Sequence, residues 1–165
     1  MRFHNRFGAI AAALAAMSAP ASADVPTAIG APGERAVVTL HAQGAQVYEC
    51  RTGQDGNLAW TFREPIASLF LDGKTVGRHY TGPNWEHMDS SMVVAKVSGN
   101  APGATPKDIP WLRLTVSAQH GQGLLSGVTT IQRINTVGGM MSGRCDTAGA
   151  LYSAPYATDY VFLRK

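Results

Sequence analysis

Alternation of apolar and polar residues is the feature that most constrains the fold of this 165-residue chain. In "WLRLTVSAQH", residues 111–120, Leu112 and Leu114 fall on one face of an extended strand, and Trp111 and Arg113 fall on the other. Similar segments recur at short spacing, separated by glycine, proline and Asp-Gly turn signals. After residue 23, no window sustains a helical period over ten or more residues. The pattern predicts an all-β fold: a single-domain antiparallel sandwich or barrel with long Gly/Pro-rich loops.

Individual strands can be placed from the same alternation. Residues 35–42 and 45–51 read as a hairpin around Gly44, and "QDGN" at 54–57 reads as a turn before a short strand. The apolar run 67–71 fits a strand or one helical turn, and Asp72-Gly73 closes it. Further strands are predicted at 91–99, 111–120, 127–136 and 156–165, with a loop at 100–110.

The first 23 residues have the three parts of a secretory signal peptide. Arg2 and Arg6 supply positive charge, residues 8–17 form a short apolar run, and Ala21-Ser22-Ala23 fits a cleavage site. A buried N-terminal helix is the alternative. The pattern predicts cleavage between Ala23 and Asp24, and a secreted or periplasmic protein. The predicted organisation is a signal peptide at 1–23, an extended leader at 24–35 and one β-rich domain at 36–165.

Charge and hydropathy argue against two classes of partner. The chain has 14 Lys and Arg against 11 Asp and Glu, and two of the basic residues lie in the predicted signal peptide. Since the remainder is almost neutral and has no basic block, we expect no nucleic-acid or anionic-membrane partner. No later segment reaches the roughly 20 apolar residues of a transmembrane helix.

The two cysteines, Cys50 and Cys145, are most simply paired in one disulfide. An isolated even pair in an oxidising compartment usually forms such a bridge. Two free thiols or a thiolate metal site are the alternatives, but the chain has no C-x-x-C spacing.

The stretch "HYTGPNWEHMDSS", residues 79–91, concentrates the chemically capable side chains. Gly82-Pro83 predicts that it is a structured turn between two strands, at the mouth of the main concavity. In one reading Trp85 offers a flat apolar face to a ligand, and Glu86 and Asp89 anchor its polar part. In the other, Trp85 caps the core and Asp89 binds the turn backbone. The candidate ligand-binding residues are His79, Tyr80, Trp85, Glu86, Asp89 and Trp111.

The sequence evidence for catalysis or for metal binding is weaker. His79, Glu86, His87, Asp89 and His120 are possible metal ligands, but their spacing is not that of a metal-binding helix. No G-x-S-x-G nucleophile motif or G-x-G-x-x-G nucleotide loop is present. We therefore predict no metal, no cofactor and no catalytic residue. A hydrolase using the region of His79, Glu86 and Asp89 stays an alternative.

Several blocks resemble one protein family in the same order. They are "GAQVYEC", "VGRHYTGPNWEHMDSSMVVAKV", "IPWLRL", "GQGLLSGVTTIQRINTVGG" and "YATDYVF". Over nearly all of residues 36–163 the chain resembles an exported bacterial and fungal family, domain of unknown function 3455. The resemblance implies a secreted, β-rich single domain and no established activity. The family usually has Asp-Gly-Ser where this chain has Asp89-Ser90-Ser91, which makes a positive φ at Ser90 unfavourable.

The combined interpretation is an exported binding module without catalysis. The expected ligand is a small molecule or a surface polymer such as a polysaccharide. A structural or envelope-associated role is the second hypothesis, and the hydrolase is the third.

Overall fold

A computed structural model describes residues 24–165 of the chain; the predicted signal peptide lies outside the described residues. The fold is all-β, as predicted, and the only helical element of the described part is a three-residue 3-10 helix, η1 (Thr27–Ile29). The strands are β1 (Arg35–Thr52), β2 (Leu58–Leu71), β3 (Lys74–Tyr80), β4 (Asn84–His87), β5 (Met92–Ala101), β6 (Trp111–His120), β7 (Thr130–Gly138) and β8 (Leu151–Arg164).

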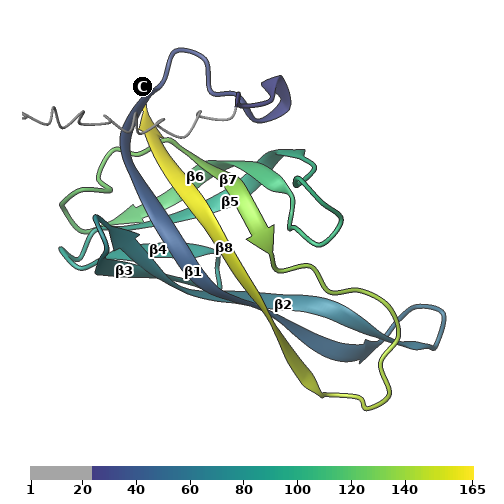
Figure 1. Cartoon of the computed structure of the whole chain (residues 1–165). Helices are drawn as coiled ribbons and strands as arrows, with labels where there is room; N and C mark the ends of the chain where they lie inside the picture. The colour runs from purple at the N-terminus through teal and green to yellow at the C-terminus, as the bar shows by residue number, and fades with distance from the viewer. Residues whose placement is uncertain (1–23) are drawn as a thin grey trace, which may run out of the picture.

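The eight strands close into an antiparallel barrel (Figure 1). Each strand pairs with the next one along the chain, and β8 pairs with β1 to complete the ring. Of the two predicted arrangements, sandwich or barrel, the chain therefore forms the barrel. An eight-stranded barrel has an interior just wide enough to be filled by side chains or to hold one small ligand.

Alternating residues of each strand fill the barrel. On β6 the buried Leu114 points inward and the exposed Thr115 points outward, as the sequence pattern predicts. The largest side chains of the core come from β4 and β8. The fully buried members with less than 2% exposure include Leu40, Leu69, Trp85, Val93, Leu125, Ile131, Tyr160 and Phe162.

The predicted hairpin around Gly44 is wrong, because residues 35–52 form one continuous strand. Gly44 pairs with Ala67 of β2 on one side and with Tyr156 of β8 on the other. A Cβ atom at Gly44 would lie 2.6 Å from Ala67 Cα, inside van der Waals contact. The glycine therefore permits a close approach of two strands and does not mark a turn.

The predicted single turn over residues 79–91 is also wrong. The short strand β4 lies within it, and two tight turns connect β4 to β3 and β5. Ser90 keeps a positive φ of 71° although it is not glycine. The prediction of a turn at Asp72-Gly73 is confirmed, since both residues have positive φ, and residues 67–71 are strand.

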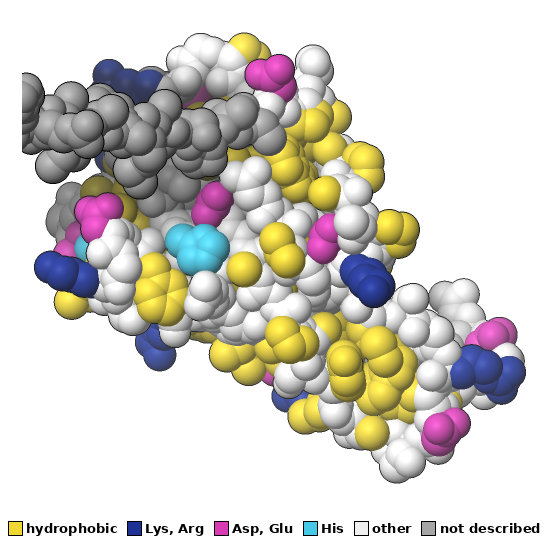
Figure 2. Space-filling view, viewed as in Figure 1, with side chains coloured by type: hydrophobic (Ala, Val, Ile, Leu, Met, Phe, Trp, Pro, Cys, Tyr) yellow, Lys and Arg dark blue, Asp and Glu magenta, His cyan; other side chains and the backbone are white. Residues whose placement is uncertain are grey.

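Parts of β1, β2 and β8 continue together beyond the barrel as an arm, which we define as residues 47–64 and 139–153 (Figure 1). The predicted disulfide is confirmed: Cys50 on β1 is bonded to Cys145 in the loop before β8, with 5.9 Å between their Cα atoms. Hydrophobic side chains gather on the arm surface (Figure 2), where Leu151 and Tyr152 are 56% and 42% exposed.

The segment before β1 packs against the barrel. Ile29 is fully buried. Its carbonyl oxygen accepts a hydrogen bond from Gln132 Nε2 at 2.7 Å, and the Gly30 carbonyl accepts one from Arg113 Nη1 at 3.0 Å. Within residues 24–165, no helix has the length and hydrophobicity needed to cross a membrane.

Candidate ligand-binding cavity

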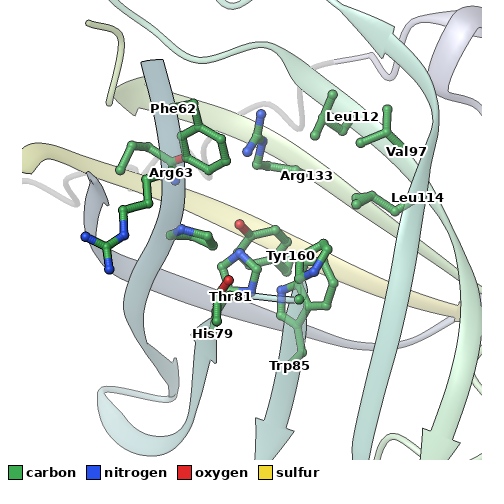
Figure 3. A pocket seen from close by; sticks show the side chains of 14 residues that line it. Phe62, Arg63, His79, Thr81, Trp85, Val97, Leu112, Leu114, Arg133 and Tyr160 are labelled. Atoms are coloured by element: carbon green, nitrogen blue, oxygen red, sulfur yellow. The ribbon is translucent and has the colours of Figure 1, made fainter. Parts of the chain in front are cut away.

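A cavity of about 340 Å³ lies inside the barrel, and every one of the eight strands contributes to its wall. Its deep end is formed by β3, β4 and β8, and its outer part by β2, β5, β6 and β7 (Figure 3). The apolar part of the lining comprises Phe62, Pro65, Pro83, Trp85, Val97, Leu112 and Leu114.

The cavity opens to solvent between β2 and β5, because β3 and β4, the two strands that lie between them in the sheet, are short. β2 pairs with β3 only from Ala67 onward, and β5 pairs with β4 only up to Val94. We call this opening the mouth. Phe62 of β2 and Val97 of β5 line it and are 50% and 57% exposed.

Three rings form the deep wall of the cavity. His79 on β3 lies opposite Trp85 on β4, and the two rings stack with 4.3 Å between centroids and 15° between planes. Tyr160 of β8 meets both rings edge-on, at 5.1 Å from His79 and 5.3 Å from Trp85. The cluster is buried, since Trp85 and Tyr160 are each 1% exposed and His79 is 3% exposed.

His79 is a neutral imidazole. Burial lowers the pKa of His79 to about 3, and the positive charge of Arg133 acts in the same direction. Nδ1 lies 2.9 Å from the carbonyl oxygen of Asn84, so it carries the proton and donates. Nε2 is therefore the unprotonated nitrogen of the ring.

Three buried polar atoms of the cavity lining have no hydrogen-bond partner among residues 24–165: Trp85 Nε1, Gln46 Nε2 and Tyr160 Oη. A buried donor without an acceptor costs about 1–3 kcal/mol, and native proteins contain few of them. Their clustering around one cavity makes its wall rich in free hydrogen-bond donors.

The charged side chains of the cavity lining are all basic. The lining includes two arginines and no aspartate or glutamate. Arg63 forms an ion pair with Glu64, with 3.1 Å between Nε and Oε1. Arg133 donates from Nε and Nη2 to the Pro110 carbonyl at 3.0 and 2.8 Å, and it makes no ion pair within the described part of the chain.

Of the six candidate residues, His79 and Trp85 line the cavity. Tyr80 and Glu86 alternate with them and lie on the outer surface of the barrel. There Glu86 accepts hydrogen bonds from Tyr80 Oη at 3.0 Å and from Arg78 Nη2 at 2.8 Å. These contacts, Arg78 above all, lower the pKa of Glu86.

Asp89 and Trp111 lie away from the cavity. Asp89 is in the turn between β4 and β5, where its carboxylate accepts from the Ser91 backbone N–H at 2.9 Å and the Leu124 backbone N–H at 2.7 Å. These bonds fasten that turn to the loop before β7. Trp111 begins β6 on the face opposite Leu112, which lines the cavity.

The structure does not bring together the residues of the hydrolase alternative. His79 points into the barrel, Glu86 points outward, and Asp89 is bound to a turn. Within residues 24–165, no group of three or more His, Cys, Asp or Glu is arranged to hold a metal ion.

Sequence reasoning missed Gln46, Arg133 and Tyr160. A usable signal existed for Arg133, because "TIQRIN" places it two residues after Ile131 on the inward face of a predicted strand. A charged residue on a buried face marks a special environment. Tyr160 shares its face with Phe162 in the same way.

Comparison with known proteins adds a family. A family model described as a protein of unknown function (DUF3455) matches residues 31–164, which include all eight strands of the barrel. No curated protein and no solved structure shows significant similarity to the chain. The match confirms the resemblance seen in the sequence, and the chain belongs to the DUF3455 family.

Proposed function

We propose that this protein is an exported, non-catalytic binding protein that holds one small molecule with an apolar body inside its barrel. The observation that carries the proposal is the open cavity of about 340 Å³ with a buried aromatic wall and unpartnered donors. Ligand cavities of roughly 300–1,000 Å³ with mostly apolar walls and a few polar groups are typical of small-molecule sites.

The size of the cavity favours a small molecule over a surface polymer. At roughly 30 Å³ for each water molecule, its volume corresponds to about ten waters. The stacked His79 and Trp85 rings and Tyr160 close its deep end. A polysaccharide chain would need an extended groove, whereas this geometry accommodates a compact ligand or one end of a longer one.

The chemistry of the wall favours binding over catalysis. A general base works best with a pKa near the pH of the reaction. The pKa of His79 is about 3, so it is a weak base at neutral pH. Glu86 and Asp89, the two acidic candidates, are engaged outside the cavity.

Export is part of the proposal. Cleavage between Ala23 and Asp24 would leave residues 24–165, and the Cys50–Cys145 disulfide is compatible with an oxidising compartment. Mass measurement of protein recovered outside the cytoplasm tests this step. A mass that still includes residues 1–23 would refute the cleavage site.

Fluorescence titration with N-phenyl-1-naphthylamine, a neutral apolar probe, tests the cavity. Val97→Trp should weaken probe binding at least tenfold, because the larger side chain fills the mouth. Val137→Trp is the matched control: Val137 is also an exposed strand valine, 65% accessible, and it does not line the cavity. The proposal fails if the probe does not bind the wild-type protein, or if both variants bind it as the wild type does.

A further inference from the structure

We infer that the ligand is an organic anion, with an apolar body and one carboxylate- or sulfonate-type head group, and that Arg133 binds this head group. The inference rests on the proposed function and names the ligand class for the same cavity. Three observations carry it: the inward position of Arg133, its lack of an acidic partner, and the hydrogen-bond donors among the neighbouring buried atoms.

The register of the sheet turns Arg133 toward the barrel interior. It pairs with Tyr160 on β8 and with Leu112 on β6, and both of these residues line the cavity. Figure 3 shows its guanidinium group between Phe62 and Leu112, in the outer part of the cavity. Arg133 is half-buried, so an anion bound beside its guanidinium group would be screened less by solvent than at an open surface.

The existing contacts of Arg133 orient its side chain without neutralising it. Nε and Nη2 both donate to the Pro110 carbonyl oxygen, which is a neutral acceptor. Since no aspartate or glutamate lines the cavity, no carboxylate of the wall balances the charge. An anion bound in the cavity would supply that balance through charge-assisted hydrogen bonds.

The other unpartnered atoms are also donors. The indole Nε1 of Trp85 and the amide Nε2 of Gln46 can only donate. Burial raises the pKa of Tyr160, so its phenol keeps its proton and can donate as well. A carboxylate or sulfonate oxygen accepts several such bonds, whereas a ligand that carries only donors would leave the Trp85 and Gln46 N–H groups unmet.

Two probes that differ by one anionic group test the inference. 1-Anilinonaphthalene-8-sulfonate is N-phenyl-1-naphthylamine with an added sulfonate. The wild-type protein should bind the sulfonate at least tenfold more tightly than the neutral probe. Arg133→Gln should weaken sulfonate binding by at least tenfold and change the affinity for the neutral probe less than threefold.

Arg63→Gln is the matched control, because it removes an arginine from the lining of the same cavity. Arg63 already has Glu64 as its partner, so this variant should keep the preference for the sulfonate. Arg133→Lys, which retains the charge, should keep part of that preference. It also serves as the test variant if Arg133→Gln does not fold, and a preference as large as that of the wild type would then contradict the inference, because lysine lacks the planar fork of the guanidinium group.

The possible outcomes separate the two proposals. Equal wild-type affinity for both probes, or an unchanged preference in folded Arg133→Gln, would overturn the anion inference and leave the binding function standing. Failure of the neutral probe to bind the wild-type protein would overturn the binding function itself.

Discussion

His79 and Trp85 stack face to face from opposed positions on β3 and β4, with 4.3 Å between their ring centroids. Trp85 belongs to the hydrophobic core, the buried His79 lies against it, and both rings form the deep wall of the cavity. The two interpretations of Trp85, as a core cap and as a ligand platform, are therefore compatible.

Replacing Trp85 should destabilise the barrel. Trp85→Ala removes a fully buried ring and should lower the free energy of unfolding by about 3–5 kcal/mol, as large-to-small aromatic substitutions in cores do. Urea unfolding followed by far-UV circular dichroism measures the change. Trp85→Phe should lose clearly less, because an aromatic ring still fills the space beside His79 and Tyr160. A loss below about 1 kcal/mol for Trp85→Ala would contradict the core role.

Burial of His79 should make stability fall in mild acid. Its folded pKa is about 3 and its ordinary value is 6.5, so below pH 6.5 the unfolded chain binds a proton that the folded chain does not. The stability that neutral His79 contributes is therefore fully present above pH 6.5. Below it, the free energy of unfolding falls by about 1.4 kcal/mol per pH unit. Wild-type stability should drop by roughly 2–3 kcal/mol between pH 7 and 4.5 relative to His79→Gln.

Urea unfolding at several pH values checks this slope. His120→Gln is the control, because His120 is exposed and its replacement should leave the slope in place. A His79→Gln variant that loses stability with pH as steeply as the wild type would show that another group is responsible.

Asp89 should stabilise the fold without contributing to the cavity. Asp89→Ala leaves the backbone N–H groups of Leu124 and Ser91 without their acceptor and should cost about 1–3 kcal/mol. Binding of N-phenyl-1-naphthylamine by the folded protein should be unchanged. Reduced probe affinity with normal stability would instead place Asp89 in the binding site.

The close approach of β1 and β2 at Gly44 predicts that even a methyl group is not tolerated there. Gly44→Ala would force the new Cβ against Ala67 and should cost at least about 1–3 kcal/mol. Gly53→Ala is the control, because the nearest atom to its Cβ belongs to the flexible side chain of Asp55, at 3.0 Å. Equal urea midpoints for the two variants would contradict the packing argument.

The sequence predicted the fold class and most strands because alternation reports directly on which side of a sheet is buried. It failed at Gly44, since a glycine in a turn and a glycine at a close strand contact look alike in one dimension. It also joined two turns and β4 into one turn, because four residues are too few to show a period.

The candidate site was predicted in part for the same reason. Local reasoning found His79 and Trp85, which are close in sequence as well as in space. It could not separate them from Glu86, which alternation turns to the outer surface. Gln46, Arg133 and Tyr160 come from distant strands, and only closure of the barrel brings them to the same cavity.

The most direct test of the binding function observes the three tryptophan indole N–H resonances of the chain in a ¹H–¹⁵N NMR spectrum during titration with N-phenyl-1-naphthylamine. Trp85 lines the cavity, whereas Trp60 lies on the arm beside Tyr152 and Trp111 begins β6 on the outer face. Binding inside the barrel predicts that the Trp85 resonance, assigned with Trp85→Phe, shifts to saturation with one equivalent bound while the other two stay in place. An unmoved Trp85 resonance, with or without shifts of Trp60 or Trp111, would contradict binding inside the barrel.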